Sequence, residues 1–344
     1  MVSRFNTFAE KIGVDLGTAN VLIYVHGRGI IVNEPSVLAV NTRTNEVLAV
    51  GEDAKKMVGK TPAHIVATRP LVDGIISDFE ATEKMLKYFF DKVRKGRLAF
   101  FSRPYVVIGV PLDITEVEKK AVEDAVFSAG AKEVFLIEEV TAAAIGAGLP
   151  IQEATASMII DIGGGTTDIA VLSLGGVVTS KSLRIAGDEF NRDILTYARE
   201  KYNLLLGERM AEEIKIGIGS VIPLEEPISM PMRGRDLSTG LPKEIIVGDV
   251  EIRDVLMRSV RGIVEYIREV LEMTPPDLVA DIYRKGMVLT GGGALIRGLD
   301  ELIAQEVKVP VYVADDPLSA VVRGTGIVLQ DLALLKEISI PSAQ

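Results

Sequence analysis

One pattern occurs twice in the chain, and it restricts the possible folds more than any other feature. The two copies are IGVDLGTANVLIYVHGRGIIV, from Ile12, and MIIDIGGGTTDIAVLSLGGVVT, from Met158. Each contains an apolar strand, an aspartate (Asp15 or Asp161), one apolar residue, a glycine-containing turn and a second apolar strand. This is the pattern of a β-hairpin whose turn can approach a phosphate group. The repetition predicts a duplicated architecture with two similar halves.

Strands and helices alternate elsewhere along the chain. Residues 105–111 are nearly all apolar, as in a strand buried on both faces. Residues 113–131 have the spacing of an amphipathic helix, and Thr115 with Glu118 predicts a capping box at its start. Residues 286–307 predict a strand, a glycine turn and a helix. The fold class is therefore α/β.

Composition excludes several classes of protein. The 344 residues are long enough for two domains, and they include no cysteine, which rules out disulfide frameworks, thiolate metal sites and cysteine nucleophiles. The net charge of −10 makes broad nucleic-acid binding unexpected. No apolar run reaches the length of a membrane-spanning helix, and the first residues lack the apolar core of a signal peptide. We therefore expect a cytoplasmic protein.

Three glycine turns follow three predicted strands, and they are the strongest candidates for a binding site. They are Gly17-Thr18-Ala19-Asn20, Gly163-Gly164-Gly165-Thr166-Thr167 and Gly291-Gly292-Gly293. Backbone N–H groups in such turns can approach phosphate oxygens because no Cβ intervenes. The carboxylates of Asp15 and Asp161 would repel phosphate unless a cation lay between them, and Mg²⁺ with its retained waters fits that position. A lone glycine turn is more often a simple hairpin, but three such turns favour phosphate binding.

Other candidate motifs are weaker. AKKMVGKT (residues 54–61) resembles the end of a P-loop, but Ala54 stands where the first glycine belongs. His26 and His64 have no partners at metal-ligand spacing, so we expect structural roles for both. Glu138 and Glu139 lie at the end of a predicted strand, where a carboxylate can orient or deprotonate water. A solvated acidic pair is the alternative, and spacing alone does not exclude it.

A basic and aromatic loop is predicted at RLAFFSRP, residues 97–104. Leu98, Phe100 and Phe101 are flanked by basic residues and bracketed by glycine and proline, which predicts an exposed connection. Insertion of these side chains into an anionic membrane surface is one hypothesis, and burial in the core or against a neighbouring subunit is the other. Phe5 and Phe8, near the N-terminus, lie on one face of a short predicted helix and are secondary membrane candidates.

Ten segments spread from about Lys11 to Leu335 carry a family resemblance. They are DLGTAN, NEPSVLAV, RPLVDGIISDFEAT, VVIGVP with TEVEKKAV, IEEVTAAAIGAGLP, DIGGGTTDIAV, RIAGDEF, GRDLSTGLP, TPPDLVADI and VLTGGGALIRGLD. The Asp-anchored turns alone indicate the superfamily of actins, 70-kDa chaperones and sugar kinases. The full set resembles the MreB family, the rod-shape-determining bacterial actins.

The resemblance implies a fold and a function. The fold is actin-like (ribonuclease H-like), with two domains around a nucleotide cleft, each divided into a core and an inserted subdomain. The expected boundaries are 1–152 with 318–344 for domain I, 153–317 for domain II, and about 33–74 and 188–253 for the inserts. The family binds ATP with Mg²⁺, hydrolyses ATP and forms paired protofilaments on the inner face of the cell membrane. Its partners are further copies of itself, a transmembrane adaptor and the cell-wall elongation proteins.

The resemblance also implies roles for individual residues. Asp15, Gly17, Thr18, Ala19 and Asn20 would hold the phosphates on one side, and Asp161, Gly163, Gly164, Gly165 and Thr166 on the other. Glu212 and Lys215 would contact the ribose and adenine, and Gly291, Gly292, Gly293 and Ala294 would lie beside the adenine. Glu139 would be the catalytic glutamate, with Thr166 placing the attacking water, and Asp15 and Asp161 would hold Mg²⁺ through water.

Two residues depart from the family pattern. Val140 replaces the usual proline after the second glutamate, which predicts a less rigid backbone beside Glu139. Gly217 replaces a glutamate in IKIGIG and would cost up to about 1 kcal/mol in a helix. Two further alternatives are a plasmid or organelle filament protein and a small-molecule kinase. A chaperone would need a peptide-binding module after the last glycine turn, and only a few dozen residues follow that turn.

Overall fold

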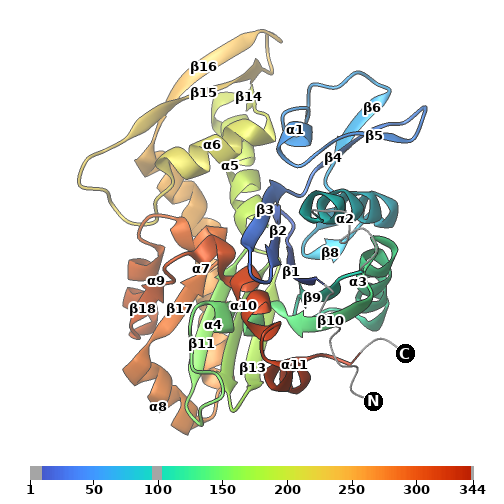
Figure 1. Cartoon of the computed structure of the whole chain (residues 1–344). Helices are drawn as coiled ribbons and strands as arrows, with labels where there is room; N and C mark the ends of the chain where they lie inside the picture. The colour runs from blue at the N-terminus through green and yellow to red at the C-terminus, as the bar shows by residue number, and fades with distance from the viewer. Residues whose placement is uncertain (1–9, 95–102, 342–344) are drawn as a thin grey trace. The chain divides into compact units, whose positions relative to one another are not determined.

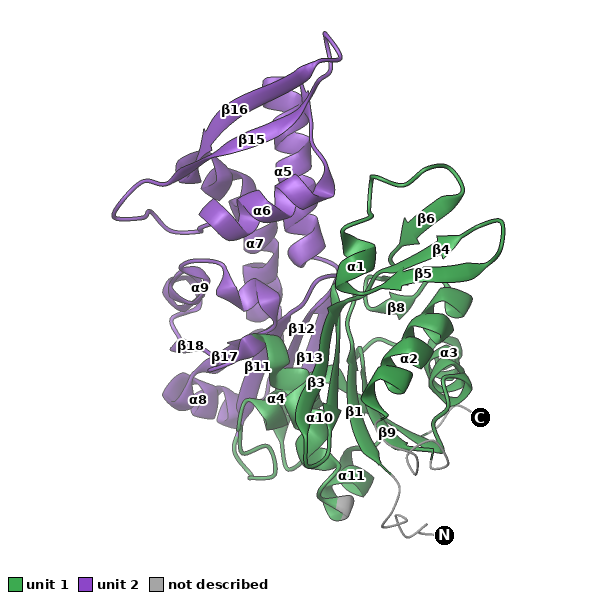
Figure 2. Cartoon of the chain, turned by 45° about the horizontal axis from the view of Figure 1, so that its top comes forward, with its two compact units in different colours: residues 1–155, 172–177, 318–344 green, residues 156–171, 178–317 purple. Residues whose placement is uncertain are grey.

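The computed structural model describes residues 10–94 and 103–341 of the chain. It divides into two compact units, coloured separately in Figure 2. Unit 1 comprises Met1–Thr155, Leu172–Val177 and Leu318–Gln344, and unit 2 comprises Ala156–Val171 and Val178–Pro317. Within the described ranges, no helix combines the length and the apolar character that crossing a bilayer requires.

Unit 1 is built on a five-stranded sheet with the order β10-β9-β1-β2-β3. Strands β1, β2 and β3 form a continuous antiparallel meander, and β9 and β10 run parallel to β1. The bounds are β1 (Lys11–Leu16), β2 (Asn20–Val25), β3 (Gly29–Pro35), β9 (Tyr105–Val110) and β10 (Glu133–Glu138). The first copy of the repeated pattern is thus a hairpin with Asp15 near the end of its first strand, as predicted.

Five helices of unit 1 accompany this sheet (Figure 1). They are α2 (Phe79–Val93), α3 (Glu116–Ser128), α4 (Glu139–Gly146), α10 (Ala320–Val328) and α11 (Leu332–Ile338). The predicted capping box begins α3: the Thr115 side chain accepts from the backbone N–H of Glu118, and the Glu118 carboxylate accepts from that of Thr115. Local side-chain chemistry therefore fixes the start of this helix.

A smaller sheet lies between β3 and α2 in the chain. Its order is β5-β4-β6, with β4 (Leu38–Asn41), β5 (Glu46–Val50) and β6 (Ile65–Thr68), and the short helix α1 (Glu52–Lys55) follows β5. A two-stranded hairpin follows, β7 (Leu71–Val72) and β8 (Ile75–Ile76). Its turn residues Asp73 and Gly74 both have positive φ, of 49° and 79°, as a type I′ hairpin turn requires.

Unit 2 repeats the sheet topology of unit 1. Its sheet order is β13-β12-β11-β17-β18, so three consecutive strands are again followed by two later strands that run parallel to the first. The bounds are β11 (Ser157–Ile162), β12 (Thr167–Ser173), β13 (Gly176–Leu183), β17 (Met287–Thr290) and β18 (Val311–Val313). The repeated order confirms the duplication that the sequence pattern predicts.

The other elements of unit 2 are mostly helical (Figure 1). They are α5 (Gly187–Tyr202), α6 (Glu208–Ile218), α7 (Asp249–Met273), α8 (Pro276–Lys285), the 3₁₀ helix η2 (Gly292–Leu295) and α9 (Leu299–Val307); a further 3₁₀ helix, η3 (Pro317–Ser319), follows β18. A small sheet has the order β14-β15-β16, with β14 (Leu204–Leu205), β15 (Ser229–Asp236) and β16 (Pro242–Gly248).

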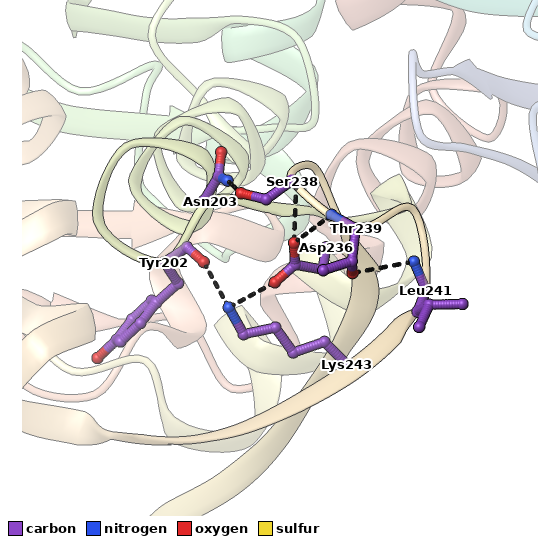
Figure 3. Close-up of polar contacts among 7 residues, drawn as sticks. All are labelled: Tyr202, Asn203, Asp236, Ser238, Thr239, Leu241 and Lys243. Carbon is purple, nitrogen blue, oxygen red and sulfur yellow. Dashed lines mark hydrogen bonds and ion pairs between the residues drawn. The ribbon is translucent and has the colours of Figure 1, made fainter.

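The GRDLSTGLP segment forms the turn between β15 and β16 (Figure 3). One carboxylate oxygen of Asp236 accepts from the backbone N–H groups of Ser238 and Thr239, at 2.8 and 3.0 Å. The other accepts from the Lys243 ammonium at 2.9 Å, and that ammonium also donates to the Tyr202 carbonyl at 3.1 Å. The hydrogen bond from Lys243 is the main reason why the pKa of Asp236 falls to about 2. The turn is therefore fixed by its own polar side chains.

Each unit has its own apolar core. In unit 1, the sheet packs against the buried face of α2, including Met85, Phe89 and Phe90. In unit 2, β11 and β12 pack with Phe190 of α5 and Leu256 of α7. Burial of side chains of this size contributes about 1.5–3 kcal/mol each. These cores hold the strand ends, and with them the glycine turns, in place.

Candidate functional site

The first glycine turn joins β1 to β2 in unit 1. The backbone N–H of Gly17 donates to the carbonyl of Asn20 at 3.1 Å, which closes the turn. A Cβ on Gly17 would lie 2.8 Å from that same carbonyl oxygen, so this position requires glycine. Burial raises the pKa of Asp15, at the base of the turn, from 3.8 to about 7. A carboxyl group in this environment gains from a nearby cation.

Two residues outside the turn hydrogen-bond to it. Ser36 is fully buried; its hydroxyl donates to the Gly17 carbonyl at 2.5 Å, and its N–H donates to the Ala19 carbonyl at 3.0 Å. The N–H of Gly74, in the β7–β8 turn, donates to the Thr18 hydroxyl oxygen at 2.8 Å. Ser36 and Gly74 were not among the predicted site residues, although both lie in segments that carry the family resemblance.

The two adjacent glutamates have different surroundings. Glu138 ends β10, and one of its carboxylate oxygens accepts from the Thr141 hydroxyl at 3.0 Å. Glu139 begins α4 and lies over β9, where a Cβ on Gly109 would be 2.9 Å from the Glu139 Cγ. Gly109 directly follows Ile108 in β9, the strand that pairs with β1. Glu139 is therefore carried over the strand beside that of Asp15.

Close helix packing fixes the position of α4. A Cβ on Gly146 would lie 1.8 Å from the carbonyl oxygen of Ala320 in α10, and a Cβ on Gly324 would lie 1.8 Å from that of Ala142. The two backbones thus touch at glycine positions, where no larger residue fits without movement. Val140, which stands where the family usually has proline, is fully buried. The helix that begins at Glu139 is therefore packed closely against α10.

The second glycine turn, in unit 2, closes in the same way as the first. The N–H of Gly163 donates to the carbonyl of Thr166 at 2.9 Å. The carbonyls of Gly163 and Gly164 accept from the N–H groups of Gly187 and Asp188, at 3.1 and 2.8 Å. These two donors are the first residues of α5. The first two residues of α5 therefore hold the carbonyls of the glycine turn by hydrogen bonds.

Glu212 and Lys215 of α6 are joined to the same region. The Lys215 ammonium donates to the Glu212 carboxylate and to the Gly187 carbonyl, both at 3.0 Å. The same Glu212 oxygen accepts from the Asn191 side-chain amide at 2.7 Å. The pair predicted to contact the nucleoside is thus attached to the helix that supports the second turn.

The end of α6 accounts for one of the two departures from the family pattern. A Cβ on Gly217 would lie 3.1 Å from the sulfur of Met230, so Met230 occupies the space beside this glycine. The Arg297 guanidinium donates to the carbonyls of Ile216 and Gly219 and closes the helix. Packing and capping thus compensate for the low helix propensity of glycine.

The third glycine turn lies against the strand that carries Asp161. Gly291 has a φ of 78°, and a Cβ there would lie 2.5 Å from an Asp161 carboxylate oxygen and 2.3 Å from the Ile162 carbonyl oxygen. A Cβ on Gly293 would lie 2.1 Å from a methyl carbon of Ile162. The segment after Gly291 is the 3₁₀ helix η2, which includes Ala294.

The predicted site residues therefore fall into two groups. Unit 1 contains Asp15, Gly17, Thr18, Ala19, Asn20 and Glu139, and unit 2 contains Asp161, Gly163, Gly164, Gly165, Thr166, Glu212, Lys215, Gly291, Gly292, Gly293 and Ala294. Leu98, Phe100, Phe101, Phe5 and Phe8 lie outside the described residues. Arg94, which precedes the predicted loop, donates to the Gly130 carbonyl at 3.0 Å and is half-buried. Its charge is thus directed into unit 1.

Each unit by itself contains a carboxyl group of the kind that holds Mg²⁺ in proteins. Each unit supplies one carboxyl group at the base of a glycine turn, Asp15 or Asp161, and Asp161 is only 8% exposed. Among the described residues, no group of three or more His, Asp or Glu side chains is arranged to hold a metal. Mg²⁺ retains several waters and is commonly held by one or two carboxylates together with substrate phosphates. A carboxyl group at the base of a glycine turn, taken in either unit by itself, is compatible with that mode of binding.

The family model described as MreB/Mbl protein matches residues 9–337. The cell shape-determining protein Mbl of Bacillus cereus is 53% identical over 325 residues, which cover 94% of this chain and 97% of that protein. The cell shape-determining protein MreB of Escherichia coli is 49% identical over 335 residues, which cover 96% of each chain.

Solved structures give the same result. MreB 5 of Spiroplasma citri bound to AMPPNP has a TM-score of 0.90 and 41% identity, covering 95% of this chain and 97% of that one. The MamK double helical filament has a TM-score of 0.80 at 22% identity and supports the actin-like fold alone. The family model and the two relatives each span most of the chain. This chain therefore belongs to the MreB/Mbl family of actin homologues that includes cell shape-determining proteins.

Proposed function

We propose that the protein binds ATP with Mg²⁺, hydrolyses it, and assembles into membrane-associated filaments that direct cell-wall elongation and rod shape. The observation that carries this proposal is the pair of glycine turns that follow Asp15 and Asp161. In each turn the carbonyl of the first glycine, Gly17 or Gly163, accepts a hydrogen bond from a residue outside the turn. Relatives with bound AMPPNP and ADP, at 41% and 42% identity, support nucleotide binding.

Each unit supplies its own groups to the nucleotide. The N–H groups of the Gly17–Asn20 turn and of the Gly163–Thr166 turn bind phosphate oxygens. Mg²⁺, when bound, offsets the charge of those phosphates against the carboxylates of Asp15 and Asp161. Glu212 and Lys215 bind the ribose and adenine, and the turn at Gly291 lies beside the adenine.

Glu139 is the residue we propose for hydrolysis. It begins α4, directly after Glu138, whose carboxylate accepts from the Thr141 hydroxyl. Glu139 orients or deprotonates the attacking water, and the Thr166 hydroxyl helps to place that water. The contact with Gly109 and the packing of α4 on α10 hold the carboxylate in position.

Self-assembly and membrane attachment complete the proposal. The filament consists of paired protofilaments, and Leu98, Phe100 and Phe101 insert into the inner face of the cell membrane, assisted by Phe5 and Phe8. One monomer binds weakly, whereas a filament presents many such loops together and binds strongly. A transmembrane adaptor and the cell-wall elongation proteins are the proposed partners.

Sedimentation after addition of ATP tests the assembly. We expect wild-type protein to pellet with Mg·ATP and to remain in the supernatant with EDTA. Steady phosphate release without any acceptor molecule supports the filament ATPase. ATP turnover that requires an added sugar, without pelleting, would instead indicate a small-molecule kinase and contradict the proposal.

Flotation with anionic liposomes tests the membrane part separately. Wild-type protein should float with ATP and float poorly without it. The triple variant Leu98→Ser, Phe100→Ser, Phe101→Ser should pellet normally with ATP but lose flotation. Full flotation of this variant would show that the loop is not the anchor.

A further inference from the structure

Ser36 is placed where it can control the geometry of the first glycine turn. It lies between β3 and β4 and is fully buried, so its polar atoms need partners within the protein. Both of its donors are directed at the turn: the hydroxyl at the Gly17 carbonyl, 2.5 Å away, and the N–H at the Ala19 carbonyl, 3.0 Å away.

These two bonds determine where the amides of the turn point. The carbonyl of Gly17 shares a peptide unit with the N–H of Thr18, and the carbonyl of Ala19 shares one with the N–H of Asn20. In a trans peptide the C=O and N–H point in opposite directions. Because both carbonyls are drawn toward Ser36, the two N–H groups are directed to the opposite side of the turn. That is the arrangement that binds an anion.

The second glycine turn provides an internal comparison. There, the carbonyl of Gly163 accepts from the N–H of Gly187 at the start of α5. Gly163 is the counterpart of Gly17, since each donates its own N–H to the carbonyl three residues later. The corresponding carbonyl therefore accepts a hydrogen bond in each unit. In unit 2 the donor is the N–H of Gly187, at the start of α5, and in unit 1 it is the Ser36 hydroxyl.

We propose that Ser36 is a positioning residue for phosphate binding, which holds the Thr18 and Asn20 amides toward the nucleotide without touching it. This inference rests on the proposed function, because it assumes that the first turn binds phosphate. It predicts that the hydroxyl of Ser36 matters for the phosphates of the ligand and not for its nucleoside part.

Ser36→Ala removes the hydroxyl and keeps the backbone N–H. We expect ATP affinity to fall roughly tenfold, the scale of one lost hydrogen bond, while adenosine affinity stays within about twofold of wild type. Ser36→Cys, with a weaker donor of similar size, should give an intermediate loss. Thr274→Val is the matched control: Thr274 is a buried residue of unit 2 whose hydroxyl donates to the Val270 carbonyl. This variant should lower thermal stability without changing the ratio of ATP to adenosine affinity.

Hydrogen exchange of the nucleotide-free protein provides a second readout. The segment around Gly17–Asn20 should exchange faster in Ser36→Ala than in wild type, whereas it should be unchanged in Thr274→Val. Absence of ATP binding by the wild type would refute the proposed function. The exchange data would still show whether the Ser36 hydroxyl holds the first glycine turn in place. ATP affinity of folded Ser36→Ala within twofold of wild type would overturn the role of Ser36, as would an equal loss of ATP and adenosine affinity.

Discussion

Glu139 lies directly over Gly109: a Cβ on this glycine would come within 2.9 Å of the Glu139 Cγ. The space above β9 that the glutamate occupies exists because residue 109 has no side chain. The position of the proposed catalytic carboxylate, at the start of α4, is thus set by a residue of strand β9.

Gly109→Ala should therefore slow ATP hydrolysis without impairing ATP binding. The added methyl displaces Glu139, and a positioned acid or base typically contributes about 10²–10⁴-fold to the rate. We expect phosphate release to slow at least about tenfold in Gly109→Ala. In Glu139→Ala, which lacks the carboxylate altogether, it should slow by about 10²–10⁴-fold. Both variants should bind ATP within a few-fold of wild type. Wild-type phosphate release by Glu139→Ala would exclude this residue and make Glu138 the next candidate.

Asp15→Asn should stabilise the nucleotide-free protein at neutral and higher pH. Burial raises the pKa of Asp15 from 3.8 to about 7, so its ionisation is unfavourable in the folded state. Below about pH 4 the Asp15 carboxyl is protonated in both the folded and the unfolded protein. Its ionisation therefore makes no difference between the stabilities of wild type and variant at that pH. As the pH rises from about 4 to about 7, wild type loses about 4 kcal/mol of stability relative to the variant, and the difference is constant above that pH.

Chemical denaturation of the two proteins between pH 5 and pH 9, in EDTA, measures this difference. Parallel stability curves across this pH range would show that ionisation of Asp15 does not destabilise the folded protein. A variant that is more stable yet binds Mg·ATP less well would indicate that the carboxylate is kept for binding.

Lys215→Ala should weaken nucleoside binding. The Lys215 ammonium joins Glu212 to the Gly187 carbonyl, so its removal breaks one of the links between Glu212 and α5. We expect adenosine and ATP affinities to fall by a similar factor, about tenfold, which corresponds to about 1.4 kcal/mol. Arg209→Ala is the control on the same helix, because Arg209 forms an exposed ion pair with Glu213 that contributes little. Competition binding should separate the two variants; equal affinities would argue against the assigned role of Lys215.

Gly324→Ala should destabilise unit 1. The new Cβ would lie 1.8 Å from the Ala142 carbonyl oxygen, so α10 must move away from α4. Overpacking of this kind typically costs about 1–3 kcal/mol. Gly176→Ala is the matched control, because a Cβ there would meet no atom within 4 Å. Thermal denaturation should show a clear drop for the first variant only; similar melting temperatures would contradict the packing argument.

Features that depend on neighbouring residues in the chain were predictable from the sequence. The two hairpins with Asp15 and Asp161 and the capping box of Thr115 and Glu118 all arise from contacts within a few residues. Their chemistry is local, so pattern and residue type are enough to identify them.

Features that depend on tertiary contact were not predictable. Ser36 acts on Gly17, 19 residues away, and only the pairing of β2 with β3 brings them together. The contact between Gly109 and Glu139 depends on the packing of α4 over β9, which the sequence pattern does not predict. Arg94 is one of the basic residues near the predicted exposed loop, and its guanidinium donates to the Gly130 carbonyl. Sequence gives the charge of such a side chain and not the direction in which it points.

The proposed function requires that the aspartates of the two repeated turns hold Mg·ATP, and a titration of ATP with and without Mg²⁺ measures this binding. Calorimetry should show that Mg²⁺ strengthens ATP binding by wild-type protein at least about tenfold. Asp15→Ala and Asp161→Ala should each lose most of that gain and should also fail to pellet with Mg·ATP. Wild-type dependence on Mg²⁺ in both variants would contradict the account.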